Sequence, residues 1–362
     1  MGTKEIEYSI MEELRMGPDI YIYGAGFVGR KVLKLCRENN LKNIVAAMVD
    51  EPYYQENSFL EGIPIYTPEM VLAKRKDEIV ILMGMKDMSK GHKLKEGFPQ
   101  IKKVYCLPNL ACEEEFYLSR EEYVRHQLQI SEVQTLLADE VSKEVFSAWI
   151  EGCISYDVSK IFNYCKEHIS YFNNGIFGVE GDSSYVDVGA YIGDTIEDYI
   201  EYNNAVKHIY AFEGDAEFCE QMHKKFCVAD GAIADRIKIY SCILWSKNTE
   251  VSFAKSSQDA YVGACVHENN SEKNDVAKTL DSVLLNNIEG VDLLKINVIG
   301  SAEVLEGAAS IVRKFHPKIA IKVGWTGFDN TYKIITLLKK YNYQIYMRFN
   351  GARLEELTIY AK

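Results

Sequence analysis

Two acidic residues in the second half of the sequence follow hydrophobic segments that read as neighbouring strands. Asp187 lies near the end of the segment SYVDV, just before a turn that contains Gly189 and Gly193. Glu213 follows the next segment, HIYAF, 20 residues beyond Gly193. In open α/β sheets, ligands bind at the carboxyl ends of the strands. We therefore expect the two carboxylates to lie together at a binding edge.

The type and spacing of these residues indicate the chemistry of the ligand. The turn lacks the GxGxxG spacing that brings backbone N–H groups to a pyrophosphate. An acid before such a turn suits S-adenosylmethionine (SAM), whose ammonium group needs an acid and main-chain carbonyls. A carboxylate at the position of Glu213 can accept hydrogen bonds from both ribose hydroxyls. The alternative is a structural turn followed by a surface acid, and two acids at successive strand ends argue against it.

A second glycine-rich turn lies near the N-terminus. The sequence YGAGFVGRKV places Gly24, Gly26 and Gly29 in GxGxxG spacing between an expected strand and an expected helix. Asp50 ends the next strand, 21 residues after Gly29, where an acid can bind ribose hydroxyls. A nucleotide is therefore the candidate ligand of this region. The alternative is a Rossmann fold that serves as a scaffold or binds another ligand.

Alternating strands and helices are expected around this turn. The segments that read as strands are 20–23, 44–49, 79–83 and 102–107. One helix begins near Phe27, and another follows Thr67, which suits an N-cap because Pro68 takes the first helical position. Strand–helix alternation predicts a parallel sheet covered by helices. Residues 1–110 are therefore expected to form a Rossmann-like domain of the nucleotide-binding type.

Residues 111–170 differ from both flanking regions, because they are polar, helical in period and free of glycine runs. We interpret them as a helical connector. Within it, Tyr156 and Lys160 have the spacing of a short-chain dehydrogenase dyad. The sequence is rich in tyrosine and lysine, so we interpret this pair as part of a solvated helix face.

From residue 184 the alternation of strands returns. The segments that read as strands are 184–188, 208–212, 237–241, 250–254, 291–298 and 318–323. The chain ends in two further strand-like segments around the turn signal Asn350-Gly351. The predicted fold class is α/β with two Rossmann-like domains. The second, residues 171–362, is expected to be a class I SAM methyltransferase sheet that ends in an antiparallel hairpin.

Composition excludes several classes of function. The chain of 362 residues has a net charge of −12, which argues against a broad nucleic-acid-binding face. Its nine cysteines form no CxxC motif and have no zinc-finger spacing with the seven histidines, so no metal site is expected. No apolar run is long enough to span a bilayer, and the first residues lack the apolar segment of a signal peptide. We expect a cytoplasmic protein with reduced cysteines that binds neither nucleic acid nor a membrane.

The order of these motifs resembles the FkbM family of SAM-dependent methyltransferases. The matching stretches, from about residue 171 onward, are YFNNGIFGVEGDSSYVDVGAYIGDT, IYAFEGD, TLDSVL, LLKINVIG with LEGA behind it, and HPKIAIKV. Family members are typically O-methyltransferases that act on hydroxyls of sugars or secondary metabolites. The N-terminal domain looks like those fused to some family members and to some sugar-nucleotide-modifying enzymes.

The resemblance implies roles for individual residues. The implied SAM-binding residues are Asp187, Gly189, Ala190, Gly193, Asp194 and Glu213, of which the last would hold the ribose. Where this chain reads KINVIG, the family usually reads lysine, any residue, aspartate, an aliphatic residue, glutamate and glycine. Lys295 and Asn297 are therefore the candidate catalytic positions, although Asn297 and Ile299 replace the two acids. Gly324 and Trp325 stand where members often carry Tyr-His.

Asparagine cannot act as a base near neutral pH, although its carbonyl can orient a hydroxyl or an ammonium group. The leading hypothesis is therefore a SAM-dependent O-methyltransferase with a changed acceptor site. Its acceptor would be a small molecule or glycan that carries a sugar-like or secondary-metabolite hydroxyl. The alternatives are a non-catalytic protein that binds SAM or a nucleotide and, ranked last, an NAD-dependent oxidoreductase. The oligomeric state stays open, and a homodimer is one of the options.

Overall fold

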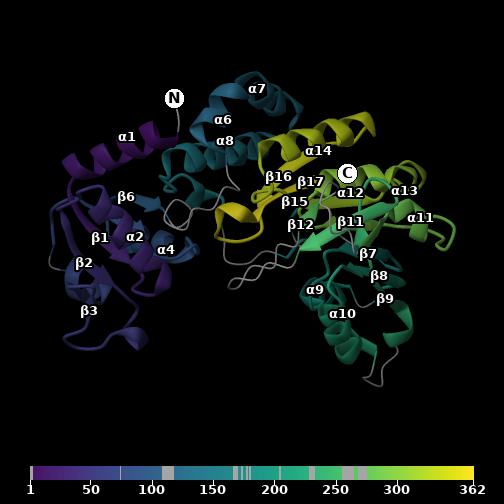
Figure 1. Cartoon of the computed structure of the whole chain (residues 1–362), viewed down its shortest axis with the longest axis horizontal. Coiled ribbons are helices and arrows are strands. Elements are labelled where there is room, and N and C mark those ends of the chain that lie inside the picture. Colours follow the sequence, from purple (N-terminus) through teal and green to yellow (C-terminus); the bar gives the residue numbers. More distant parts are fainter. Residues whose placement is uncertain are drawn as a thin grey trace. The chain divides into compact units, whose positions relative to one another are not determined.

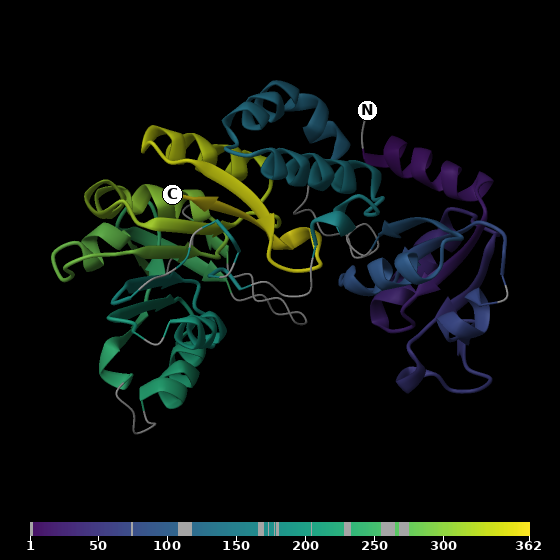
Figure 2. The ribbon, with the colours of Figure 1, turned by 180° about the vertical axis from the view of Figure 1, so that it is seen from behind.

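The computed structural model describes the whole chain except residues 1–2, 74, 108–117, 166–169, 173, 177, 179–180, 204, 228–232, 255–264 and 268–274. Two compact units can be distinguished, and each is built from several stretches of sequence (Figures 1 and 2). The N-terminal unit comprises residues 1–132, 143–168 and 349–356. The C-terminal unit comprises residues 133–142, 169–348 and 357–362. The predicted connector is thus divided between the two units.

The N-terminal unit contains a six-stranded sheet with the order β3-β4-β2-β1-β5-β6. Its strands are β1 (Asp19–Tyr23), β2 (Ile44–Met48), β3 (Phe59–Leu60), β4 (Ile63–Tyr66), β5 (Ile79–Met83) and β6 (Ile101–Cys106). All neighbouring pairs are parallel except the hairpin of β3 and β4. The four strands predicted from the sequence are confirmed. The short hairpin was not predicted, because its strands are too brief to give a periodic pattern.

Helices and an apolar core complete this unit. Its first helices are α1 (Thr3–Met16), α2 (Phe27–Glu38), α3 (Pro68–Leu72) and α4 (Ser89–Gly97). They are followed by α6 (Arg120–Arg125), α7 (Gln127–Leu136) and α8 (Glu140–Ser155), and the boundary between the units falls within the last two. Every residue of β5 is buried, as expected for an apolar strand covered on both faces. The helix α2 turns Val32, Leu33 and Cys36 toward the core.

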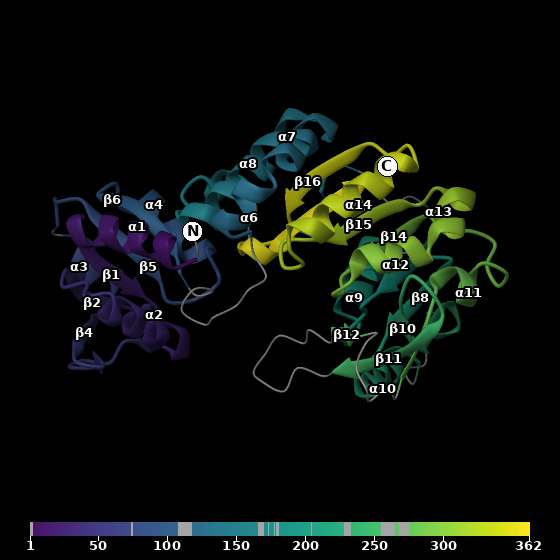
Figure 3. The same ribbon diagram turned by 45° about the horizontal axis from the view of Figure 1, so that its top comes forward.

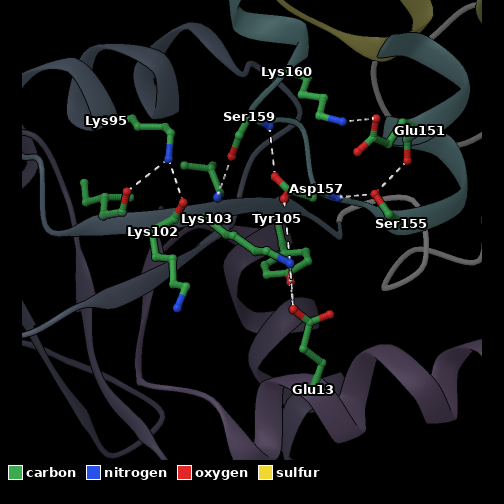
Figure 4. Close-up of polar contacts among 12 residues, drawn as sticks. Glu13, Lys95, Lys102, Lys103, Tyr105, Glu151, Ser155, Asp157, Ser159 and Lys160 are labelled. Carbon is green, nitrogen blue, oxygen red and sulfur yellow. Dashed lines mark hydrogen bonds and ion pairs between the residues drawn. The ribbon is translucent and has the colours of Figure 1, made fainter. Parts of the chain in front are cut away.

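The segment after α8 covers the edge of this sheet (Figure 4). The backbone N–H of Cys106 donates to the carbonyl of Tyr156, and the N–H of Val158 donates to that of Val104. Tyr156 has a left-handed φ of 58°, and Lys160 pairs with Glu151 at 2.7 Å. Tyr156 and Lys160 therefore do not share a helix face, contrary to our interpretation of the sequence. The segment protects the edge strand β6 from pairing with another chain.

The C-terminal unit contains a seven-stranded sheet with the order β16-β17-β15-β14-β7-β8-β9. Its strands are β7 (Ser184–Val188), β8 (His208–Glu213), β9 (Ile237–Ser241), β14 (Leu293–Ile296), β15 (Lys318–Lys322), β16 (Ile345–Phe349) and β17 (Leu357–Ala361). Its helices are α9 (Asp194–Tyr202), α10 (Ala216–Met222), α11 (Leu280–Leu284), α12 (Ser301–Gly307), α13 (Ala309–Phe315) and α14 (Phe328–Lys340). The five neighbouring strands β15, β14, β7, β8 and β9 are parallel to one another.

The sheet is closed by an antiparallel hairpin, as the sequence predicts. β17 pairs antiparallel with β15. Gln344 and Lys362 exchange both backbone hydrogen bonds, which is the pattern of an antiparallel pair between the ends of β16 and β17. The predicted fold class, two α/β units of which the second has this sheet, is confirmed.

One predicted strand of this region, 250–254, lies outside the main sheet. It forms β11 (Thr249–Ala254), which pairs antiparallel with β12 (Cys265–His267) and β13 (Asp275–Lys278). With β10 (Ile243–Leu244) these strands make a separate four-stranded sheet. β11 cannot join the main sheet in parallel beside β9 because the connection between them is too short. A parallel crossover needs about a dozen residues or more, and only residues 242–248 separate β9 from β11.

The glycine-rich turn of the N-terminal unit holds α2 close to β1. Gly24 has a φ of +113°, and a Cβ added to Gly29 would lie 2.0 Å from the carbonyl oxygen of Gly24. Only a residue without a side chain fits such an approach. A Cβ added to Gly26 would meet no atom within 4 Å. The first and third glycines of the motif are therefore required by packing, whereas the second is not.

We expect Gly29→Ala to lower the free energy of unfolding by about 1–3 kcal/mol, because strand and helix must move apart to admit the methyl group. Gly26→Ala is the matched control and should cost less, up to about 1 kcal/mol, because its methyl group meets no atom and only the N-cap preference is lost. Denaturant unfolding of the full chain measures both. Equal midpoints for the two variants would contradict the packing argument.

Candidate active site

The carboxyl ends of three strands gather the site residues predicted for the C-terminal unit. β7 pairs in parallel with both β8 and β14, and Asp187 stands opposite Ala211 on one side and Lys295 on the other. Because side chains alternate along a strand, Glu213 and Asn297 continue the same face two residues further on. The sequence positions 187, 213, 295 and 297 therefore meet at one edge of one sheet.

A buried ion pair lies beneath this edge. Lys295 Nζ is 2.7 Å from Asp187 Oδ1, and the two side chains are 2% and 0% exposed. Lys295 also donates to the carbonyl oxygen of Gly189 at 2.8 Å, and Thr195 Oγ1 donates to Asp187 Oδ2 at 2.5 Å. Both oxygens of Asp187 are thus occupied from within the unit. The pair fixes the turn after β7 to the strand β14.

The burial of this ion pair can be compared with the roles predicted for Asp187 and Lys295. The sequence suggested that Asp187 faces an ammonium group of the cofactor and that Lys295 takes part in catalysis. The structure places both side chains under the turn, bonded to each other and shielded from solvent. Both side chains are engaged by partners within the unit, and their roles toward a ligand stay predictions.

The turn itself needs glycine at two positions. Gly189 has a φ of +74°, and a Cβ added there would lie 2.4 Å from the carbonyl oxygen of Asn297. Gly193 has a φ of +81°, and a Cβ added there would lie 2.3 Å from the ring of Phe226. Ala190 between them is fully buried. Asp194 is exposed and begins α9 directly after the turn.

Glu213, the second predicted acid at this edge, is partly exposed. Its Oε2 accepts from the backbone N–H of Tyr191, and its Oε1 accepts from that of Asp215, both at 2.9 Å. Burial raises the pKa of the Glu213 carboxyl, although these main-chain donors oppose the shift. The carboxylate is therefore oriented by the turn and by the start of α10.

Sequence reasoning missed Tyr191. This residue has a left-handed φ of 51°, is 41% exposed, and its ring lies 4.6 Å from that of Phe218 in an edge-to-face arrangement. Its backbone N–H holds Glu213, so the aromatic pair stands beside the accessible acid. The only signal in the sequence was a bulky residue inside a glycine-rich turn.

Asn297 and Trp325 lie at the tips of neighbouring strands. The backbone N–H of Asn297 donates to the carbonyl of Val188 at 3.0 Å, so the strand pairing continues through this residue. Its Oδ1 is buried, as is Nε1 of Trp325, and neither atom has a hydrogen-bond partner among the described residues. Asn297 is thus the one of the two predicted catalytic positions that has an unused polar atom.

The predicted ribose-binding acid of the N-terminal unit is engaged. Asp50 accepts a hydrogen bond from the hydroxyl of Tyr23 and another from Lys90 Nζ at 2.7 Å. Burial alone would raise the pKa of Asp50, but the bonds from Lys90 and Tyr23 outweigh it and lower the pKa. A nucleotide ribose would therefore compete with two internal partners for this carboxylate.

Metal and membrane sites are not found in the described part of the chain. No group of three or more histidine, cysteine, aspartate or glutamate side chains there is arranged to hold a metal ion. None of its helices is both long and apolar enough to cross a bilayer.

A comparison with protein families finds a match within the C-terminal unit. Residues 187–345 match the model of the methyltransferase FkbM domain. We refer to this matched region as the FkbM domain. The matched residues of this FkbM domain include all four site positions from Asp187 to Asn297. No match was found among curated proteins.

Comparison with solved structures finds one protein of similar overall fold and others that match at low TM-scores. A methyltransferase FkbM from Methylobacillus flagellatus is 15% identical, with a TM-score of 0.66, over 100% of this chain and 94% of that chain. A putative methyltransferase from Streptococcus mutans in complex with SAH is 9% identical over 51% of this chain and 91% of its own, with a TM-score of 0.31. Aeropyrum pernix fibrillarin with bound S-adenosyl-L-methionine is 13% identical over 52% of this chain and 70% of its own, with a TM-score of 0.30. The similarity to the Methylobacillus flagellatus protein covers the whole chain, so the shared fold includes both units.

Removing one member of the buried pair should destabilise the FkbM domain. We expect Lys295→Met to lower the free energy of unfolding by about 3–5 kcal/mol, because Asp187 keeps a buried charge without its cation. Adding Asp187→Asn should recover part of the loss. The control is Lys207→Met, which removes an exposed partner of Glu289 and should change little. Urea unfolding measures all three, and similar losses for the two lysine variants would contradict a structural role for the pair.

Proposed function

We propose that the FkbM domain binds SAM and methylates a hydroxyl of a sugar-like or secondary-metabolite acceptor, which is a small molecule or a glycan. The observation that carries this proposal is Glu213, an accessible carboxylate held by backbone donors at the end of the second strand of the sheet. It stands beside a glycine turn that a buried ion pair fixes in place.

The chemistry of these residues fits SAM. The Glu213 carboxylate can accept about four hydrogen bonds, and the backbone of Tyr191 and Asp215 supplies two. The remaining capacity suits the two hydroxyls of a ribose. The aromatic rings of Tyr191 and Phe218 lie next to this acid and offer a face to an adenine.

When bound, SAM supplies a methyl group on a sulfonium, whose carbon–sulfur bond breaks with its electron pair moving to sulfur as an acceptor oxygen attacks. The chain's own part is to align the acceptor and exclude competing groups. Alignment alone can supply up to about 7–11 kcal/mol of barrier reduction. Asn297 can orient the hydroxyl but cannot take its proton near neutral pH, so we assign that proton to water.

A second candidate function is a non-catalytic protein that binds SAM or a nucleotide. It is favoured by Asn297 and Ile299, which leave the strand tip without an acid. An NAD-dependent oxidoreductase driven by the N-terminal unit ranks last, because Asp50 is already engaged by Tyr23 and Lys90.

Titration calorimetry with S-adenosylhomocysteine (SAH) tests the cofactor site. We expect the wild type to bind SAH and Glu213→Ala to bind it about 10- to 100-fold more weakly, since hydrogen bonds to a charged acceptor are lost. Affinity should rise with pH through the raised pKa of Glu213, because the carboxylate is the form that accepts from both hydroxyls. Glu213→Gln should flatten this dependence, and the exposed Glu289→Gln should leave it unchanged. A wild type that binds no SAH would refute the proposal.

A product assay distinguishes an active methyltransferase from a non-catalytic protein that binds SAM or a nucleotide. We expect slow methyl transfer by the wild type to a panel of sugars and natural-product hydroxyls. The double variant Asn297→Asp with Ile299→Glu should transfer about 100-fold faster or more, because a positioned base adds that much. Fast turnover by the wild type that the double variant leaves unchanged or reduces would show that this strand tip never handled the proton.

A further inference from the structure

Two buried polar atoms at the carboxyl ends of strands in the seven-stranded sheet have complementary hydrogen-bonding capacities. Asn297 Oδ1 accepts hydrogen bonds and Trp325 Nε1 donates one, yet neither finds a partner among the described residues. Buried polar groups in folded proteins are nearly always paired, and an unpaired one is costly. Two such atoms of opposite character in one region call for an explanation.

The fold brings the two residues into the same region. Asn297 directly follows β14, and Trp325 lies three residues beyond β15, the neighbouring parallel strand. The helices that follow these strands, α12 and α14, pack side by side (Figure 3). Both residues therefore belong to turns that leave adjacent strands at the edge where Glu213 also lies.

A third side chain fixes these turns to each other. Asn330 Nδ2 donates to Thr326 Oγ1 at 2.7 Å, next to Trp325 in the sequence. The same nitrogen donates to Ser301 Oγ at 3.0 Å, and Asn330 Oδ1 accepts from the backbone N–H of Ala302 at 3.1 Å. The turn after β15 is thus tied to the start of α12, a few residues beyond Asn297. The turns that carry the two unpaired atoms are therefore joined through Asn330.

We propose that Asn297 Oδ1 and Trp325 Nε1 together hold one uncharged hydroxyl of the acceptor, which donates to the first atom and accepts from the second. This inference rests on the proposed function and specifies its acceptor: a neutral polyol such as an unsubstituted sugar ring. The pair determines specificity and orients the reacting oxygen.

The chemistry of the pair distinguishes a hydroxyl from other nucleophiles. An ammonium group has no lone pair to accept from the indole, and a carboxylate has no hydrogen to donate to the amide oxygen. A hydroxyl oxygen has two lone pairs, so one can accept from Trp325 while the other stays free to attack a methyl carbon. Ile299, two residues beyond Asn297, offers no counter-charge to an ionised acceptor.

Nuclear magnetic resonance of the indole N–H groups tests the pair without any turnover. The chain has three tryptophans, so the ¹⁵N-labelled protein gives three indole signals, and Trp325→Phe identifies that of Trp325. The SAH-loaded full chain is titrated with the methyl glycosides of glucose, galactose, mannose and rhamnose, and with methyl glucuronide and glucosamine. For the best binder, deoxy and amino-deoxy analogues at each carbon follow.

We expect at least one neutral glycoside to shift the Trp325 signal, and the analogue that lacks one particular hydroxyl to bind at least about 10-fold more weakly. Asn297→Leu and Trp325→Phe should each lower the affinity for that glycoside about 10-fold and leave the affinity for SAH unchanged. The control Asn287→Leu, at an exposed asparagine of the same unit, should change neither affinity.

Two results would overturn the inference while SAH still binds. In one, the Trp325 signal is unmoved by every glycoside. In the other, Asn297→Leu binds glycosides as well as Asn287→Leu does. Failure of SAH itself to bind would instead refute the proposed function. Stronger shifts by glucosamine or methyl glucuronide than by the neutral glycosides would show that the pair does not select an uncharged hydroxyl.

Discussion

The ion pair of Asp187 and Lys295 is the constraint on which the FkbM site depends. Two opposite charges are withdrawn from water, which is tolerable only with close contact and further hydrogen bonds. Those further bonds go to Thr195 and to the carbonyl of Gly189. The turn is thereby tied to β14, and the backbone of Gly189 lies so close to that of Asn297 that no side chain fits between them. The turn after β7 and the strand β14 are thus held in close contact.

Three acids that end strands in this chain have three different environments. Asp187 is sealed inside the unit, Glu213 is held at the rim by backbone donors, and Asp50 is paired with Lys90 and Tyr23. In the sequence all three have the same appearance, a carboxylate after an apolar segment. Whether such an acid contacts a ligand is decided by the partners that the fold brings to it.

The sequence predicted the parallel strands and the glycine turns because both depend on local pattern. An apolar run needs burial, and a left-handed turn such as that at Gly193 needs glycine. The partner of Asp187 was not predictable in the same way, since Lys295 is 108 residues distant and only strand register unites them. The left-handed Tyr191 and the unpaired atoms of Asn297 and Trp325 likewise arise from tertiary placement and leave no periodic signal.

The interleaving of the two units along the chain has a consequence for biosynthesis. The N-terminal unit includes residues 349–356, which lead from β16 to β17 and are separated from the rest of that unit by residues 169–348 of the C-terminal unit. Trp149 donates its indole N–H to the carbonyl of Leu354 within that segment. The N-terminal unit therefore cannot be completed until residues 169–348 of the other unit have also been translated.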